Sequence, residues 1–148
     1  MQTEWKLIKF QELSPEELYL ILQLRNYVFV VEQNCVFQDA DGVDQACLHL
    51  MGFIGQQLAA YTRLVPAGAM YQQASIGRVV TARTFRGTGI GRELMEKSIE
   101  LVYKTFSVQP IKIGAQLYLK KFYSSLGFQQ VSNVYLEDGI EHIYMVKP

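Results

Sequence analysis

A glycine-rich turn between a strand-like segment and a helix-like segment constrains the fold of this chain most strongly. The turn reads Arg86-Gly87-Thr88-Gly89-Ile90-Gly91. The β-branched residues 75–82 before it predict a strand, and residues 91–104 after it carry apolar side chains at helical spacing. Glycines let the backbone approach an oxyanion closely, and the unpaired amides of a first helical turn point toward such an anion. The segment therefore predicts a site for a phosphate or pyrophosphate group.

The length, composition and charge predict a globular protein with a single domain over residues 1–148. Hydrophobic residues make up 49% of the chain, which suffices for a buried core. Fourteen basic and fourteen acidic residues are scattered and give no net charge, so no overall field attracts nucleic acid or an acidic membrane. No segment approaches the roughly 20 apolar residues of a membrane span, and the polar start predicts no signal peptide. We therefore expect neither nucleic acid nor a membrane as partner.

The residue types that most often hold metals are not spaced for a metal site. Cys35 and Cys47 lack the CxxC spacing and indicate free, buried thiols in a reducing compartment, with the cytoplasm as the expected location. The acidic loop with Asp39, Asp41 and Asp44 lacks the closing glutamate of a calcium-binding loop. We expect no metal, and we expect the acidic loop to be a solvated turn or to face a cationic acceptor.

The remaining pattern predicts β-hairpins that alternate with strand–helix units. Ser14-Pro15-Glu16-Glu17 is typical of a helix start with a capping box, and apolar residues follow at helical spacing. Strands are predicted over residues 5–10, 47–53, 57–65, 75–82, 111–115, 128–135 and 140–146, and two further helices over 91–104 and 117–126. This order predicts an α/β fold in which helices cover the faces of a mixed sheet.

Two well-known phosphate sites compete for the glycine-rich turn. A dinucleotide-binding turn needs a third glycine where Leu94 stands, and an acidic residue at the end of the next strand, residues 111–115, which has none. A nucleoside-triphosphate loop needs Gly-Lys-Ser/Thr, which is missing. A dinucleotide-binding domain and a plain tight turn between strand and helix stay open as the less favoured alternatives.

The turn and the segment that follows it resemble the Gcn5-related N-acetyltransferase (GNAT) superfamily. Arg86, Gly89 and Gly91 match its Q/R-x-x-G-x-G/A loop, and residues 123–128 match its later Y-x-x-x-G-F motif. Further blocks resemble the ElaA-like group of that superfamily, namely residues 28–35, 41–44, 49–50, 76–79 and 137–142. The resemblance covers nearly the whole chain and implies the GNAT fold, in which helices flank a mixed, mostly antiparallel sheet.

The resemblance implies acetyl-CoA as the acyl donor. The backbone of four strand residues would face its pantetheine arm, as an added strand faces a sheet edge: Arg78, Val79, Val80 and Thr81. The amides of the turn would bind its pyrophosphate: Arg86, Gly87, Thr88, Gly89, Ile90, Gly91 and Arg92. The Thr88 hydroxyl and the charge of Arg86 or Arg92 would add to this binding. Where many GNAT members carry an asparagine before the later helix, Gln116 is the expected substitute.

The resemblance also implies direct transfer of the acetyl group to a primary amine of a small molecule or a peptide. Tyr123 stands where many GNAT enzymes place the tyrosine that protonates the leaving sulfur, and its structural alternative is a packing tyrosine. Tyr118 is the weaker candidate because it lies on another helical face. A non-catalytic acyl-CoA-binding sensor or interaction module is the alternative function. Pairing of two copies through the C-terminal strands is common in the superfamily, so the resemblance implies a homodimer as one candidate assembly.

Three side chains are candidates for the base that deprotonates the amine. Glu32 follows the first helix in an apolar stretch, where desolvation would raise its pKa. His49 and His142 each lie on a predicted strand among apolar neighbours. Each of the three is also interpretable as a hydrogen-bonded structural residue, and a chain of waters is a further candidate.

Overall fold

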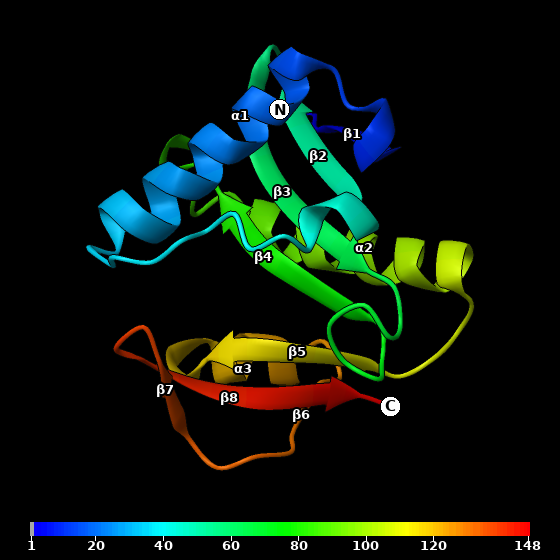
Figure 1. The fold of residues 1–148 in the computed structure, drawn as a ribbon, viewed down its shortest axis with the longest axis vertical. Helices are drawn as coiled ribbons and strands as arrows, with labels where there is room; N and C mark the ends of the chain where they lie inside the picture. Colours follow the sequence, from blue (N-terminus) through cyan, green and yellow to red (C-terminus); the bar gives the residue numbers. More distant parts are fainter. Residues whose placement is uncertain (1) are drawn as a thin grey trace.

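A computed structural model describes residues 2–148 and arranges them in two β-sheets with three α-helices (Figure 1). The strands are β1 Glu4–Lys9, β2 Leu48–Ile54, β3 Gln57–Val65, β4 Ser75–Thr81, β5 Ile111–Gln116, β6 Gln129–Gln130, β7 Tyr135–Glu137 and β8 Ile140–Lys147. The helices are α1 Pro15–Arg25, α2 Ile90–Phe106 and α3 Lys120–Ser124, and a π-helix, Asn26–Glu32, directly continues α1. Within this described range, no helix has the length and apolar character needed to cross a membrane.

The first sheet is antiparallel throughout, with the strand order β1-β2-β3-β4. One face packs against α1, where Ile21 joins a buried cluster with Met51 and Tyr61. The other face packs against α2, where Leu94 joins a cluster with Leu50. Figure 1 shows the two helices on opposite sides of this sheet. The alternation of side chains along β2 explains why both faces are buried.

Helix α1 begins as the sequence predicts and then departs from the prediction at its end. Ser14 accepts a hydrogen bond from the Glu17 amide at 3.1 Å, and the Glu17 carboxylate accepts one from the Ser14 amide at 2.9 Å. After Arg25 the helix widens into the π-helix Asn26–Glu32, which no signal in the sequence predicts. A π-helix shifts the side chains that follow it around the helix axis and is frequent at functional sites.

The second sheet contains the strands β5, β8 and β6 in that order, and β7 pairs with β8 as well. The sequence predicts one strand over residues 128–135, but the structure divides it into β6 and β7. The division occurs because the Ser132 hydroxyl accepts a hydrogen bond from the Tyr144 amide at 2.8 Å, a group that would otherwise pair with backbone. The Val131 amide still donates to the Tyr144 carbonyl at 2.9 Å, so the ladder is interrupted at residues 132–134.

The two sheets are joined at one parallel bridge between Ala74 and Ile111, where the Lys112 amide donates to the Ala74 carbonyl at 2.9 Å. Beyond this bridge, β4 and β5 run in the same direction and diverge toward their carboxyl ends (Figure 1). The arrangement confirms the predicted fold class, a mixed and mostly antiparallel sheet flanked by helices.

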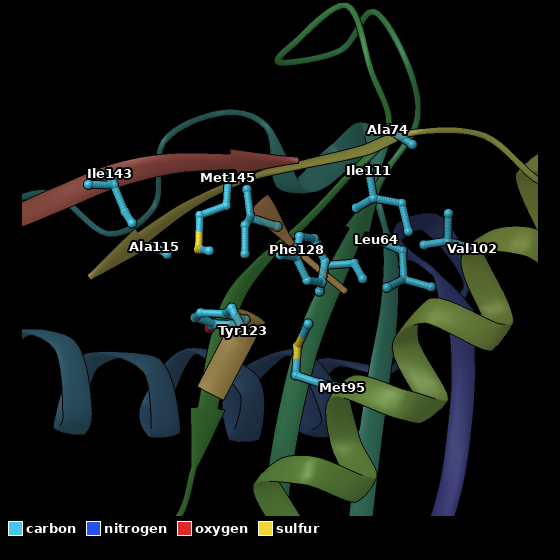
Figure 2. Packing of buried hydrophobic residues seen from close by; sticks show 12 residues of the cluster. Leu64, Ala74, Met95, Val102, Ile111, Ala115, Tyr123, Phe128, Ile143 and Met145 are labelled. Atoms are coloured by element: carbon cyan, nitrogen blue, oxygen red, sulfur yellow. The ribbon is translucent and has the colours of Figure 1, made fainter. Parts of the chain in front are cut away.

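A hydrophobic cluster holds both sheets and two helices together below the bridge (Figure 2). Met95 and Val102 come from α2, Tyr123 from α3, and Ile143 and Met145 from β8. Helix α3 is shorter than the predicted helix over 117–126, since its first turn, Leu117–Leu119, is a 3-10 turn. Packing in this cluster fixes α3, and with it Tyr123, against the place where the strands diverge.

Candidate active site

The space between the diverging strands β4 and β5 forms a cleft of about 630 Å³. Its walls come from the π-helix and the loop after it, from β4, from the glycine-rich turn, from β5 and α3, and from the β7–β8 hairpin. Of the candidate site residues, those that line the cleft are Glu32, Arg78, Val79, Val80, Thr81, Arg86, Gly91, Gln116, Tyr123 and His142. The candidate residues that do not line it are His49, Gly87, Thr88, Gly89, Ile90 and Arg92.

The β4 wall contains a β-bulge at the predicted pantetheine strand. On β3, Tyr61 pairs with Val80 and Arg63 pairs with Gly77. Two residues of β4, Arg78 and Val79, therefore lie opposite one residue of β3, Thr62. Arg78 adopts the left-handed conformation, with φ of 49°. A bulge leaves a residue without its ladder partner, so this wall offers backbone groups that an extended ligand can use.

The glycine-rich turn leads directly into α2. Gly87 and Gly89 have φ of 80° and 86°, a region that side-chain-bearing residues rarely adopt, and Gly89 is the N-cap of the helix. Gly91 lies in the first helical turn, and a β-carbon placed there would meet no described atom within 4 Å. Gly91 therefore leaves space beside the first turn of α2, at a point where this turn lines the cleft.

The side chains of the turn depart from their predicted roles. The Thr88 hydroxyl donates to the Phe85 carbonyl at 2.6 Å, so it braces the turn instead of extending into the cleft. The Arg92 guanidinium donates to the Ser125 hydroxyl on the α3 side. Arg86 points across the cleft wall, where its Nε and Nη2 atoms donate to the Thr81 carbonyl at 3.3 and 3.1 Å. Of the two candidate arginines, Arg92 is the one without a carboxylate partner among the described residues.

The expectation of a raised pKa for Glu32 is wrong. Arg86 donates two hydrogen bonds to the Glu32 carboxylate, at 2.7 and 2.9 Å. This contact lowers the pKa of Glu32, because it stabilises the charged form. Glu32 is therefore a weak base at neutral pH, although it lines the cleft.

Tyr123 is buried, with 5% of its surface exposed, and its ring packs edge-on against Phe122 and Phe128. Burial raises the pKa of Tyr123 well above its usual value, so the phenol stays protonated near neutral pH. Among residues 2–148 its hydroxyl has no hydrogen-bond partner, and the residue lines the cleft. Such a hydroxyl suits a proton donor. Tyr118 is 75% exposed and lines the mouth of the cleft instead.

His142 is 7% exposed and lines the cleft from β8. Its Nδ1 lies 2.7 Å from the Ile140 carbonyl, which can only accept, so we assign the proton to Nδ1. The lone pair is then on Nε2, which lies 3.5 Å from the Glu137 carboxylate. The ring is held by stacking on Tyr135, with 5.8 Å between ring centroids. This arrangement suits a proton acceptor.

His49 lies in the core of the first sheet, which removes it from the candidate bases. It is 1% exposed, and both ring nitrogens have partners: the Tyr61 hydroxyl at 2.6 Å and the Asp44 carbonyl at 2.9 Å. Burial lowers the pKa of His49, which keeps the ring neutral. The structural interpretation of this histidine therefore replaces the catalytic one.

Two contacts join opposite walls of the cleft, and no motif in the sequence predicts either of them. The Cys35 thiol donates to the Asp138 carbonyl at 3.2 Å, which joins the loop after the π-helix to the β7–β8 turn. The Gln116 amide donates to the Gln33 side chain at 3.4 Å. Cys35 and Cys47 are both buried free thiols, as predicted, and burial raises the pKa of Cys47 to about 11. Only the fold brings these partners together, since Cys35 and Asp138 are 103 residues apart.

The acidic loop is not the solvated turn that the sequence predicts. Arg25 is fully buried, and its guanidinium donates to the carboxylates of Asp39 and Asp44, both at 2.8 Å. Arg63, from β3, donates to Asp44 at 2.9 Å and is 1% exposed. One signal for this network lies in the sequence, because Arg25 stands at helical spacing from Ile21 and Leu22 and therefore on the apolar face of the predicted helix.

The same network reaches the β4 wall of the cleft. Arg63 donates two hydrogen bonds to Asp41, at 2.8 and 2.7 Å, and Arg78 donates to the Asp39 carbonyl at 2.9 Å. Burial alone would raise the pKa of Asp41, but the guanidinium of Arg63 holds it well below its usual range. Within residues 2–148, no group of three or more His, Cys, Asp or Glu side chains is arranged to hold a metal.

The comparisons with known proteins agree with this architecture. Residues 50–148 match the acetyltransferase (GNAT) domain family. Protein ElaA of Escherichia coli K12 is 42% identical over 146 residues, which cover 97% of this chain and 95% of that protein.

Two solved structures are similar to this chain in both fold and sequence. An acyl-CoA N-acyltransferase from Pseudomonas aeruginosa has a TM-score of 0.95 at 40% identity, covering 99% of this chain and 100% of the other. The structure of Escherichia coli ElaA has a TM-score of 0.93 at 40% identity, with the same coverage. The chain therefore belongs to the GNAT acetyltransferase family and, within it, to the ElaA-like group.

Proposed function

We propose that this protein transfers an acetyl group from acetyl-CoA directly to a primary amine of a small molecule or a peptide. One observation supports this most: a single cleft combines the bulged β4 backbone, Gly91 in the first turn of α2 and the side chain of Tyr123. Each is a part that acetyl transfer needs, namely a groove for an extended arm, an anion site and a proton donor.

The residues around the cleft fit acetyl-CoA. The backbone of residues 78–81 would bind the pantetheine arm, and the amides of residues 86–92 would bind the pyrophosphate. The open space at Gly91 leaves room for a phosphate oxygen. Arg92, which has no carboxylate partner within the described chain, would add a charge-assisted contact. When bound there, acetyl-CoA supplies the acetyl group as an activated thioester.

The proton transfers follow from the two side chains that line the deep part of the cleft. His142 Nε2 would take a proton from the attacking amine, because its lone pair is free and its ring is fixed through Nδ1. A backbone amide of the β4 bulge would stabilise the negative charge that develops on the thioester oxygen. The Tyr123 hydroxyl would donate its proton to the leaving sulfur, since burial keeps the phenol protonated.

The test is release of CoA thiol from acetyl-CoA across a panel of primary amines, with Tyr123→Phe as the informative variant. We expect turnover by the native protein and a fall in kcat of about 100-fold in the variant. Affinity for acetyl-CoA, measured by calorimetry, should change little because the ring still packs. Tight binding without turnover by the native protein would instead identify the alternative function, a non-catalytic acyl-CoA sensor.

Two further expectations accompany this proposal. The free thiols Cys35 and Cys47 would remain reduced in the cytoplasm, and we propose that location. Pairing of two copies through the C-terminal strands stays a prediction, and light scattering of the purified protein tests it.

A further inference from the structure

The end of the cleft around His142, where the acceptor amine would react, carries negative charge that the protein does not neutralise. Two of the positive side chains there are already balanced: Arg86 pairs with Glu32, and Arg78 pairs with Asp39 and Asp41 behind the wall. Glu137 and Asp138, at the β7–β8 turn, also line the cleft. Neither forms an ion pair with a lysine or arginine among residues 2–148, and the Glu137 side chain is 59% exposed.

A second observation concerns the ring nitrogen of His142 at this end. His142 is more than nine-tenths buried and lines the cleft, yet its Nε2 receives no hydrogen bond from any residue that the structure describes. The Glu137 carboxylate lies 3.5 Å from that nitrogen. A reacting amine at Nε2 would therefore lie beside Glu137, and any chain attached to it would extend along the β7–β8 turn.

The turn that presents these carboxylates is held in place. Asp138 adopts the left-handed conformation, with φ of 51°, and its carbonyl accepts the hydrogen bond from the Cys35 thiol. Glu137 pairs with Ile140 in the hairpin. Since the backbone of the turn is held on both sides, the two carboxylates stay next to the cleft. The protein would therefore lose little conformational entropy when a positively charged group binds there.

From these observations we infer that the acceptor is a small diamine: an alkyl primary amine that carries a second ammonium group, bound by Glu137 and Asp138. This inference rests on the proposed acetyl transfer and specifies its substrate class. The reacting nitrogen is neutral when it attacks. Its bond to the acetyl carbon forms as the carbon–sulfur bond breaks, His142 takes its proton, and Tyr123 protonates the sulfur. Solvent then returns the proton from His142 to the Tyr123 oxygen, while the second ammonium stays unchanged.

Three acceptors of equal chain length test the charge requirement. 1,4-Diaminobutane carries the second positive charge, butylamine carries none, and 4-aminobutyrate carries a negative charge in its place. We expect kcat/KM to fall about tenfold from the diamine to butylamine, because two partly exposed carboxylates each contribute a factor of about three. We expect a further fall for 4-aminobutyrate. Equal or higher kcat/KM with 4-aminobutyrate would overturn the inference.

Variants then assign the preference to these carboxylates. Glu137→Gln combined with Asp138→Asn should bring the ratio of diamine to butylamine close to one, and Glu137→Lys should favour 4-aminobutyrate. The ratio of kcat/KM for the diamine to kcat/KM for butylamine is compared within one variant. Any effect of the substitution on proton transfer to His142 changes both values alike and leaves this ratio unchanged. Glu141→Gln is the matched control, since Glu141 is exposed on the same hairpin and does not line the cleft. A ratio unchanged in the double variant would refute the assignment.

A binding measurement separates this inference from the proposed reaction. Calorimetry of the CoA-bound protein with 1,4-diaminobutane and with butylamine reports the charge preference without any turnover. A preference that disappears in the double variant supports the diamine site even if no acetyl transfer is seen, in which case the proposed reaction fails alone. Turnover without any preference for the diamine would leave the reaction standing and overturn the diamine site.

Discussion

Arg86 donates two hydrogen bonds to the Glu32 carboxylate, at 2.7 and 2.9 Å, across a separation of 54 residues in the sequence. The pair joins the end of the π-helix to the first residue of the glycine-rich turn. It therefore links the π-helix wall of the cleft to the predicted pyrophosphate site, and it keeps Glu32 charged.

The first prediction follows from this pair. Glu32→Gln should lower kcat/KM less than about tenfold and leave its pH profile unchanged, because a carboxylate with a lowered pKa is a poor base. The measurement is the pH dependence of kcat/KM with an active acceptor. Loss of the acid limb of that profile, together with a fall above 100-fold, would restore Glu32 as the base.

The second prediction concerns Gly91. Gly91→Ala should raise stability by about 0.5 kcal/mol, because alanine favours a helix and its β-carbon meets no described atom. The same β-carbon would occupy space next to the pyrophosphate, so affinity for acetyl-CoA should fall, and Gly91→Glu should abolish it. Thermal unfolding and calorimetry measure the two effects.

Gly89 is the control for this prediction. Its φ of 86° strains any larger residue, so Gly89→Ala should lower stability by about 1 kcal/mol. Gly91 therefore gives the cleaner test of the two. Full acetyl-CoA affinity in folded Gly91→Glu would remove the pyrophosphate site from this turn.

The third prediction compares the two histidines. His142→Gln should lower kcat by about 100-fold and remove the acid limb of the pH profile, since Nε2 is the proposed proton acceptor. His49→Asn should leave the pH profile as it is and lower stability by about 1–3 kcal/mol, because the Tyr61 hydroxyl and Asp44 carbonyl would lose a buried partner. A pH profile altered only in the His49 variant would reverse the two roles.

The fourth prediction concerns the buried network of arginines and aspartates. Burial would raise the pKa of Asp44, but Arg25 and Arg63 hold it below its ordinary value, and Asp41 is lowered in the same sense. The unfolded chain therefore binds more protons as the pH falls through the ordinary value of 3.8. The stability contributed by the network is full above about pH 5 and declines below it.

Denaturant unfolding at a series of pH values measures this decline. Asp44→Asn should lower the free energy of unfolding by about 3 kcal/mol at pH 7, because two buried guanidinium groups lose a charged partner. The variant should also lose stability less steeply on acidification than the native protein. An equally steep decline in both proteins would show that other carboxylates control acid unfolding.

Local sequence signals predicted most of the elements, because those elements depend on neighbouring residues. The capping box at Ser14 fixes the start of α1, and the glycine turn Gly55-Gln56 fixes the β2–β3 hairpin. The strand, turn and helix around Gly89 follow in the same way. These features need no partner that is distant in the chain.

The features that were missed depend on distant partners. The pKa of Glu32 is lowered by Arg86, and the carboxylates of the acidic loop form ion pairs with arginines from α1, β3 and β4. The strand break at Ser132 depends on one amide of β8. No periodicity within a short window contains such information, since the partner is brought close only by the fold.

A single backbone bridge, between Ala74 and Ile111, joins the two sheets, and the hydrophobic cluster below it packs them together. On the two sides of the cleft, each sheet completes its own antiparallel ladder, β3–β4 in one and β5–β8 in the other. A ligand in the cleft therefore replaces solvent and breaks none of these ladder hydrogen bonds, so filling or emptying the cleft needs no loss of secondary structure.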